Sequence, residues 1–249
     1  MTTTSMKVAA TAAMTLGASL AHADCNSLPN WSALKTALVT AVGAESSGLN
    51  FDMWATIVDR DGTVCAVAFS GSNRGAQWPG SRVISAQKAN TANAFSLDGL
   101  ALSTANLYSA VQPGGSLYGL QHSNPVDPSV AYGGNSANNG MANDFMTGNK
   151  IGGVNVFGGG LALYNAGRKI VGAVGVSGDT SCADHMIGWR VRANLQLDFV
   201  NNGPARIFAG DVTHPDNIIY DIGAGGSATG FGHPTCLNTA DPGTLPGVH

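Results

Sequence analysis

Charged residues are scarce in this chain of 249 residues, at 11% against about 25% in typical soluble domains. Its 12 Lys and Arg are fewer than its 15 Asp and Glu, which excludes a nucleic-acid binder that neutralises phosphates with a basic face. Hydrophobic residues make up 44%, so enough surface can be buried to exclude a disordered chain. Because the centres of subunit interfaces are depleted in charge, we expect a homo-oligomer.

Long hydrophobic runs are also missing, except near the beginning of the chain. Residues 8–20 are small and apolar and follow Lys7, and Ala21-His22-Ala23 has the small side chains that signal peptidase accepts. The run is shorter than the roughly 20 residues that span a bilayer. We therefore expect residues 1–23 to be a signal peptide, and the protein to be periplasmic or secreted without a membrane span.

Cysteines are few, and no two of them form a Cys-x-x-Cys motif, which argues against a zinc knuckle or a thioredoxin-like redox site. All four lie after the expected signal peptide, and an oxidising compartment favours disulfides. Four cysteines allow three pairings, and the sequence alone does not choose among them. We favour Cys25–Cys65 and Cys182–Cys236, because each would tie down one end of the chain.

Hydrophobic periodicity predicts a mixture of helices and strands. The expected elements are a helix capped by Ser32, a hairpin of strands 51–59 and 63–70, a helix from its cap Ser81 to Phe95, a regular segment over 152–157, a hairpin of strands 161–164 and 169–177, and a helix capped by Ser181. Strands joined by tight turns favour an antiparallel sheet with helices on its faces. The expected fold class is α+β in a single domain.

Two stretches lack this periodicity. Residues 99–150 are rich in Ser, Asn, Gly and Pro, and a loop of this length inside a compact domain is usually functional or an interface arm. Only 103–110 could be helical there. We therefore expect a domain over 24–200 with an insert at about 99–150, followed by an irregular tail over 201–249. The glycines at 158–160 lack the Gly-Lys-Ser/Thr of a phosphate loop, so we expect a bulge or a close approach of two backbones.

Four motifs resemble the GlcG/HbpS family. In chain order they are Val58-Asp59-Arg60-Asp61-Gly62, then Ala86-Gln87-Lys88-Ala89 with Thr91-Ala92, then Gly152-Gly153-Val154, and finally Gly172-Ala173-Val174-Gly175-Val176-Ser177-Gly178 with Asp184. The likeness covers roughly residues 33–198. It implies an antiparallel sheet with flanking helices, a ring-like or octameric assembly, and binding of haem or a similar tetrapyrrole in a sensing, storage or protective role.

A haem site requires an axial ligand for iron, an apolar slot for the ring and cations for the propionates. His185 is the first candidate for the iron ligand, because it lies in the first turn of a predicted helix, where backbone amides favour a neutral imidazole. His233 is the second candidate and His122 the third. A histidine hydrogen-bonded inside a subunit interface is the alternative for His185.

Asp184 matches the family's acidic position, and Arg82 and Lys88 are candidates for the propionates. A structural salt bridge, for instance between Lys88 and a carboxylate from the sheet, is at least as good an interpretation of each cation. A second hypothesis is an enzyme that uses Asp184 and His185 as acid and base on a small organic acid or aromatic compound. A pocket too small for a porphyrin favours the enzyme, whereas an apolar slot with an imidazole at its face favours haem.

Overall fold

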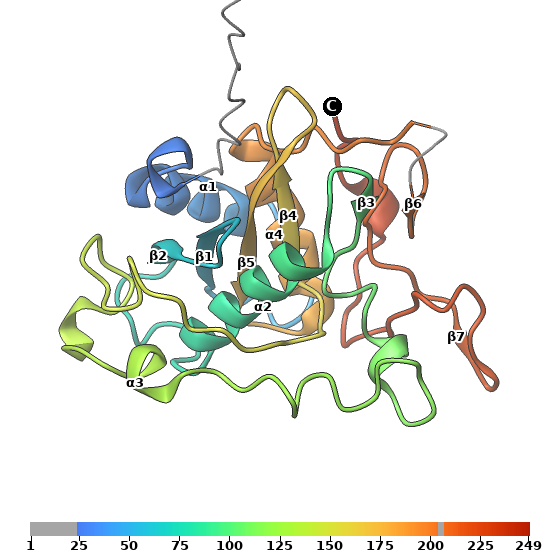
Figure 1. Ribbon diagram of the computed structural model, residues 1–249, viewed down its shortest axis with the longest axis horizontal. Helices are drawn as coiled ribbons and strands as arrows, with labels where there is room; N and C mark the ends of the chain where they lie inside the picture. Colours follow the sequence, from blue (N-terminus) through green and yellow to red (C-terminus); the bar gives the residue numbers. More distant parts are fainter. Residues whose placement is uncertain (1–23, 204–206) are drawn as a thin grey trace, which may run out of the picture.

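An antiparallel sheet of four strands, in the order β2-β1-β5-β4, lies at the centre of the computed structural model, which describes residues 24–203 and 207–249 (Figure 1). The strands are β1 (Trp54–Asp59), β2 (Val64–Phe69), β4 (Gly160–Tyr164) and β5 (Ile170–Ser177). The helices that cover the sheet are α1 (Trp31–Gly43), α2 (Ser81–Phe95) and α4 (Ser181–Asn194). Both predicted hairpins and the α+β class are confirmed, whereas the expected signal peptide lies outside the described residues.

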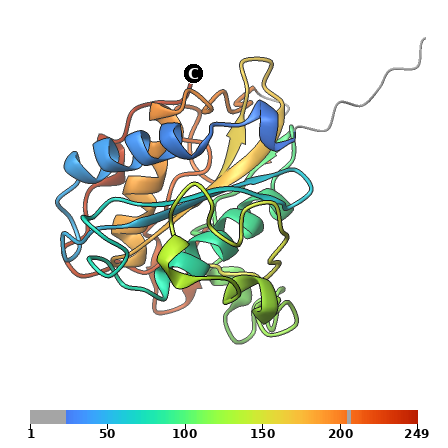
Figure 2. The same ribbon diagram turned by 90° about the vertical axis from the view of Figure 1, so that its left-hand side faces the viewer.

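The alternation of side chains along β1 gives the sheet a different core on each face. Ala55 and Ile57 pack with residues of α1 and α4, whereas Trp54 and Val58 pack with residues of α2. Figure 2 shows the same arrangement, with α1 and α4 on one side of the sheet and α2 on the other. Among the described residues, no helix is both long and apolar enough to cross a lipid bilayer.

Helix α2 lies unusually close to the sheet. A Cβ atom at Gly175 would lie 2.0 Å from the carbonyl oxygen of Ser85, and one at Gly160 would lie 2.5 Å from that of Lys88. Only glycine leaves room for the helix backbone at these two strand positions. This contact is completed by three buried alanines of α2, which are Ala86, Ala89 and Ala92. The small residues of α2 therefore serve its tight packing against the sheet.

The helix caps differ from the predicted ones. Asn30, not Ser32, caps α1, and Thr180, not Ser181, caps α4. Ser81 is the first residue of α2, and no side chain caps that helix. Asn, Ser and Thr are all good capping residues, so side-chain preference does not choose between positions one or two residues apart.

The insert is anchored to the domain. Its short elements are β3 (Leu100–Ala101), η2 (Ser109–Val111), α3 (Pro128–Ala131) and η3 (Ser136–Asn138). Residues 148–149 exchange backbone hydrogen bonds with Val64 at the open edge of β2, and Asp144 forms a buried ion pair with Arg82 of α2. The insert thereby pairs the backbone groups of Val64, which would otherwise be unpaired at this edge of the sheet.

The regular segment predicted over 152–157 is wrong. Gly152 and Gly153 have φ angles of 64° and 81°, which a pleated strand does not adopt. Gly152 makes only an isolated bridge with Val126. The helix considered near 103–110 is also absent, since turns and the single 3₁₀ turn η2 stand in its place.

The segment that follows α4 packs back onto this helix. Its elements are β6 (Ile207–Phe208), β7 (Ile222–Gly223), β8 (Gly226–Ser227) and the 3₁₀ turn η4 (Pro242–Thr244). Arg192 donates to both carboxylate oxygens of Asp216 at 2.6 and 2.8 Å, with both side chains fully buried. The indole nitrogen of Trp189 donates to the carbonyl of Pro246 at 2.9 Å.

Both predicted disulfides are present. Cys25, in the 3₁₀ turn η1 (Cys25–Ser27), is bonded to Cys65 of β2, which joins residues 40 apart in the chain. Cys182 of α4 is bonded to Cys236, which joins residues 54 apart. Each bridge attaches a terminal segment to a helix or strand of the central domain, as expected from the sequence.

Candidate functional site

A cleft of about 220 Å³ lies between α2, the beginning of α4 and the segment that leads into β4. Its lining residues are Trp78, Ser81, Ile84, Lys88, Asn155, Phe157, Ser177, Asp179, Ser181 and Asp184. Sites for drug-sized ligands usually measure about 300–1,000 Å³. The cleft therefore has room for a small molecule or for one edge of a larger one.

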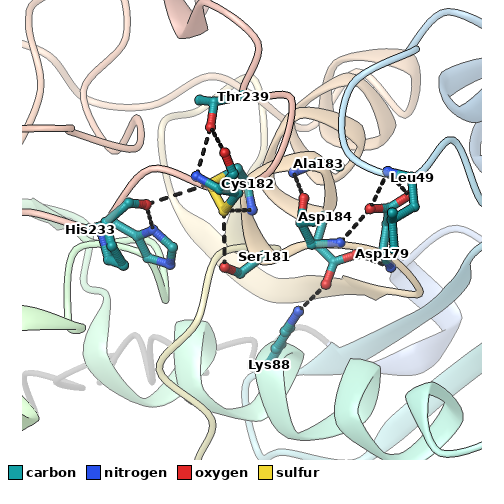
Figure 3. The surroundings of a disulfide bond; sticks show 12 residues. Leu49, Lys88, Asp179, Ser181, Cys182, Ala183, Asp184, His233 and Thr239 are labelled. Atoms are coloured by element: carbon teal, nitrogen blue, oxygen red, sulfur yellow. Dashed lines mark hydrogen bonds and ion pairs between the residues drawn. A yellow bond between two sulfur atoms is a disulfide. The ribbon is translucent and has the colours of Figure 1, made fainter.

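A buried ion pair forms one wall of this cleft. The Lys88 ammonium lies 2.6 Å from Asp184 Oδ2, with side-chain exposures of 2% and 3% (Figure 3). The other oxygen, Oδ1, accepts the backbone N–H groups of Gly178 at 3.0 Å and Asp179 at 2.9 Å. Burial raises the pKa of Asp184 to about 6, against the opposing effect of the Lys88 charge. The structural salt bridge considered for Lys88 is thus present, with a carboxylate from α4 rather than from the sheet.

Three consecutive glycines bring α4 close enough for this pair to form. A Cβ at Gly158 would lie 2.2 Å from the carbonyl oxygen of Ser181, and one at Gly159 would lie 2.3 Å from that of Val176. Gly159 also has a φ of 119°, which other residues rarely adopt. The close backbone approach predicted for 158–160 is confirmed.

Asp179 fixes the neighbouring wall of the cleft. Its carboxylate accepts the backbone N–H of Leu49 at 2.8 Å and that of Phe51 at 3.0 Å. It thereby ties the segment between α1 and β1 to the turn that precedes α4. This role of Asp179 could not be predicted from the sequence, because its partners lie about 130 residues away in the chain.

Exposed aromatic rings surround the opening of the cleft. Trp78 is 49% exposed and Phe157 is 42% exposed, and Phe51 meets Trp78 edge-to-face with ring centroids 5.4 Å apart. We call these three residues the aromatic mouth. The mouth could not be predicted from the sequence, because nothing in a Gly- and Pro-rich turn tells whether its tryptophan is exposed or buried.

His185 is fully buried and does not line the cleft. Its Nε2 lies 3.1 Å from the backbone nitrogen of Ile218 and 3.2 Å from Asn217 Oδ1, while Nδ1 has no hydrogen-bond partner among the described residues. Burial lowers the pKa of His185 to about 3, so the ring is neutral. Asp184 contacts Lys88 and the turn before α4, so the structure does not bring Asp184 and His185 together as an acid–base pair.

The other two candidate histidines also lie away from the cleft lining. His233 is 1% exposed and lies beside the Cys182–Cys236 disulfide, and burial lowers its pKa to about 4. His122 is an exposed residue of the insert. The structure therefore does not gather His185, His233 and His122 around one ligand position.

Arg82 is not available to a ligand in this conformation. It is 4% exposed, and it donates to Asp144 at 2.8 Å and to the carbonyl of Ala131 at 2.8 Å. Its role is to hold the insert against α2. Of the two cations considered for the propionates, only Lys88 lines the cleft.

The sequence matches one family model, described as haem degrading protein HbpS-like, over residues 32–191. The match spans 160 of the 249 residues and includes every residue that lines the cleft. The chain belongs to the HbpS-like family. No protein of curated function matches the sequence.

The chain is also similar to several solved structures. The haem complex of PduOC is 24% identical with a TM-score of 0.47, covering 68% of this chain and 94% of that chain. ORFY of Klebsiella pneumoniae is 25% identical with a TM-score of 0.45, covering 67% of this chain and 90% of that chain. HbpS is 14% identical with a TM-score of 0.42, covering 76% of this chain and 99% of that chain.

The cleft of this HbpS-like protein does not fit a haem whose iron is held by an imidazole. Among the residues that the structure describes, no histidine lines the cleft, and Nε2 of His185 is enclosed by Asn217 and Ile218. Ligation by His185 would require this part of the C-terminal segment to move away. The rings of the aromatic mouth can contact a planar ligand, but the described residues that line the cleft include no imidazole that could bind iron.

Proposed function

We propose that this HbpS-like protein binds haem or a closely related tetrapyrrole at the cleft and its aromatic mouth, in a non-catalytic sensing, storage or protective role. The observation that carries the proposal is the group of exposed rings, Trp78, Phe157 and Phe51, at the opening of a cleft inside the family-matched region. Large exposed aromatic side chains at a cleft are typical of a binding surface for a planar apolar ligand. A complete macrocycle exceeds about 220 Å³, so most of it would lie against the mouth.

Because no imidazole of the described residues lines the cleft, binding by the mouth should not depend on iron. The test is a titration of the full chain with haemin and, in parallel, with the same porphyrin without iron. We expect both to bind saturably and with similar affinity. If haemin binds and the iron-free porphyrin does not, iron ligation dominates the affinity. That result would overturn the proposed contact through the rings.

Variants locate the contact. Trp78→Ala and Phe157→Ala each remove a ring interaction worth roughly 0.5–1.5 kcal/mol, so each should weaken porphyrin binding by about 2- to 12-fold. Tyr118→Ala is the matched control, because Tyr118 is an aromatic residue of the insert that is 64% exposed and does not line the cleft. His185→Ala should leave the haemin spectrum unchanged. Loss of the spectrum in that variant would instead support His185 as the iron ligand.

We also propose that the protein is exported and forms a homo-oligomer. Two disulfides in one chain favour an oxidising compartment such as the periplasm or the exterior. The low charge content and the exposed aromatic rings favour a surface that is partly covered by other copies.

A second candidate function is acid–base catalysis on a small organic acid or aromatic compound. The observation that favours it is Asp184, whose pKa of about 6 lets its Oδ2 exchange a proton near neutral pH in a cleft too small for a porphyrin. Lys88 is the partner that the structure provides, in place of His185. Screening small organic acids and aromatics for turnover tests this candidate. A turnover that Asp184→Asn abolishes would support it, and the absence of any turnover would exclude it.

A further inference from the structure

Three potential metal ligands meet beside the beginning of α4, outside the cleft. Ligand atoms of Cys182, His233 and Cys236 all lie within 4.8 Å of one another. Cys182 and Cys236 are joined as a disulfide, and Figure 3 shows His233 next to that bond. In this oxidised form, the sulfur atoms are not thiolates and do not act as strong metal ligands.

The His233 ring is held in the form that binds a metal. Its Nδ1 lies 2.7 Å from the carbonyl oxygen of Pro234, and because a carbonyl can only accept, Nδ1 carries the proton. The neutral ring therefore presents an unprotonated Nε2. This atom is buried and has no hydrogen-bond partner among the described residues. Metal-binding histidines commonly donate their other ring nitrogen to a backbone carbonyl in this way.

The surroundings of the sulfur atoms favour thiolates once the disulfide is open. Cys236 Sγ accepts the backbone N–H of Cys182 at 3.2 Å, and the hydroxyl of Ser181 lies 3.6 Å from it. Amides of the first helical turn stabilise negative charge on sulfur. Cys236 is also partly exposed, so a reductant can reach the bond from this side.

The other disulfide has a similar cluster, formed by Cys25, Asp59 and Cys65. It lacks an imidazole, and Asp59 Oδ1 already accepts the backbone N–H groups of Asp61 at 3.0 Å and Thr63 at 2.8 Å. This oxygen is occupied in holding the turn between β1 and β2. The unpartnered nitrogen of His233 therefore distinguishes the first cluster from the second.

We propose that reduction of Cys182–Cys236 converts the first cluster into a site for a thiophilic metal ion such as Zn²⁺ or Cu⁺, with two thiolates and Nε2 of His233 as ligands. A dithiol supplies two electrons and two protons, the S–S bond breaks, and the dithiol becomes a disulfide. The metal then displaces the two thiol protons to solvent, while His233 loses none. Thiolate and imidazole ligands suit these metals, and a three-ligand set leaves one coordination position open.

The test is a titration of the full chain with Co²⁺, before and after reduction by a phosphine that is itself oxidised to its oxide. We expect one Co²⁺ per chain, with thiolate-to-cobalt charge-transfer absorption, only after reduction. The Cys25→Ser/Cys65→Ser variant should keep this site, and the Cys182→Ser/Cys236→Ser variant should lose it. His233→Ala should bind at least about 10-fold more weakly, since even changes beyond the direct ligands commonly cost that much.

A measurement on the unaltered chain avoids any folding defect of the variants. Zn²⁺ added to the reduced protein should protect Cys182 and Cys236 from alkylation, while Cys25 and Cys65 react, as mass spectrometry of the peptides can show. Failure of the reduced chain to bind Co²⁺, or equal protection of all four cysteines, would overturn the proposal. Haem binding at the cleft plays no part in either outcome.

Discussion

The ion pair of Lys88 and Asp184 is the residue-scale feature whose loss should affect stability most directly. Lys88→Met removes the ammonium 2.6 Å from the buried Asp184 carboxylate and leaves that charge uncompensated. Breaking a buried pair in this way costs about 3–5 kcal/mol, which urea unfolding of the variant would measure. Adding Asp184→Asn removes the stranded charge and should restore part of the loss. A Lys88→Met protein as stable as the parent would show that the pair contributes little.

His185 gives a second residue-scale prediction, through pH. Its pKa is about 3 in the folded protein and about 6.5 in an unfolded chain, so unfolding takes up a proton between these values. The stability that this histidine contributes is complete above pH 6.5 and is lost as the pH falls toward 3, by about 1.4 kcal/mol per pH unit.

The measurement is the free energy of unfolding of His185→Gln and of the parent from pH 7 to pH 4. Below about pH 6.5, the parent should lose stability more steeply than the variant. His122→Gln is the control, because His122 is exposed and its replacement should leave the pH dependence unchanged. Parallel curves for the parent and His185→Gln would contradict the burial argument.

The sequence predicted Lys88 and Asp184 as residues of interest but not their contact. They lie 96 residues apart, and their meeting depends on the close approach of α2 and α4 to the same strand end. The aromatic mouth could not be predicted from the sequence for the same reason. Side-chain type is visible in a sequence, whereas the exposure of Trp78 and the enclosure of His185 depend on segments far away in the chain.

At the scale of elements, a buried ion pair joins the C-terminal segment to α4. Asp216 binds Arg192 through two hydrogen bonds with both side chains fully buried. Asp216→Asn leaves a buried guanidinium without its counter-charge and should lower the unfolding free energy by about 3–5 kcal/mol. Lys169→Ala breaks the exposed pair with Asp98 and should change it by less than about 1 kcal/mol. Equal effects of the two changes in urea unfolding would refute the structural role of the segment.

Local patterns predicted the elements whose hydrophobic period is regular. The two hairpins and the three long helices follow such patterns, and the structure contains all of them. The failure at 152–157 has a different origin, because Gly152 and Gly153 take left-handed conformations that no period reveals. The docking of residues 148–149 on β2 and of Asp216 on Arg192 joins distant segments, so it was equally out of reach.

At the scale of the whole molecule, the remaining expectation is assembly. A chain with 11% charged residues must present a largely neutral surface, and several of its exposed side chains are large and aromatic, including Tyr118, Tyr132 and Phe145 of the insert. Burying such side chains between copies stabilises an oligomer through the area removed from water, whereas a monomer leaves them in contact with solvent.

We therefore expect sedimentation velocity of the mature chain, residues 24–249, with its disulfides intact to give the mass of at least two chains. The assembly should resist added salt, because apolar burial, unlike pairing of surface charges, is not screened. Dissociation by salt would point to charged contacts instead. A single species at the monomer mass across the accessible concentrations would contradict the expectation, and the cleft of each chain would then have to bind its ligand without help from a second copy.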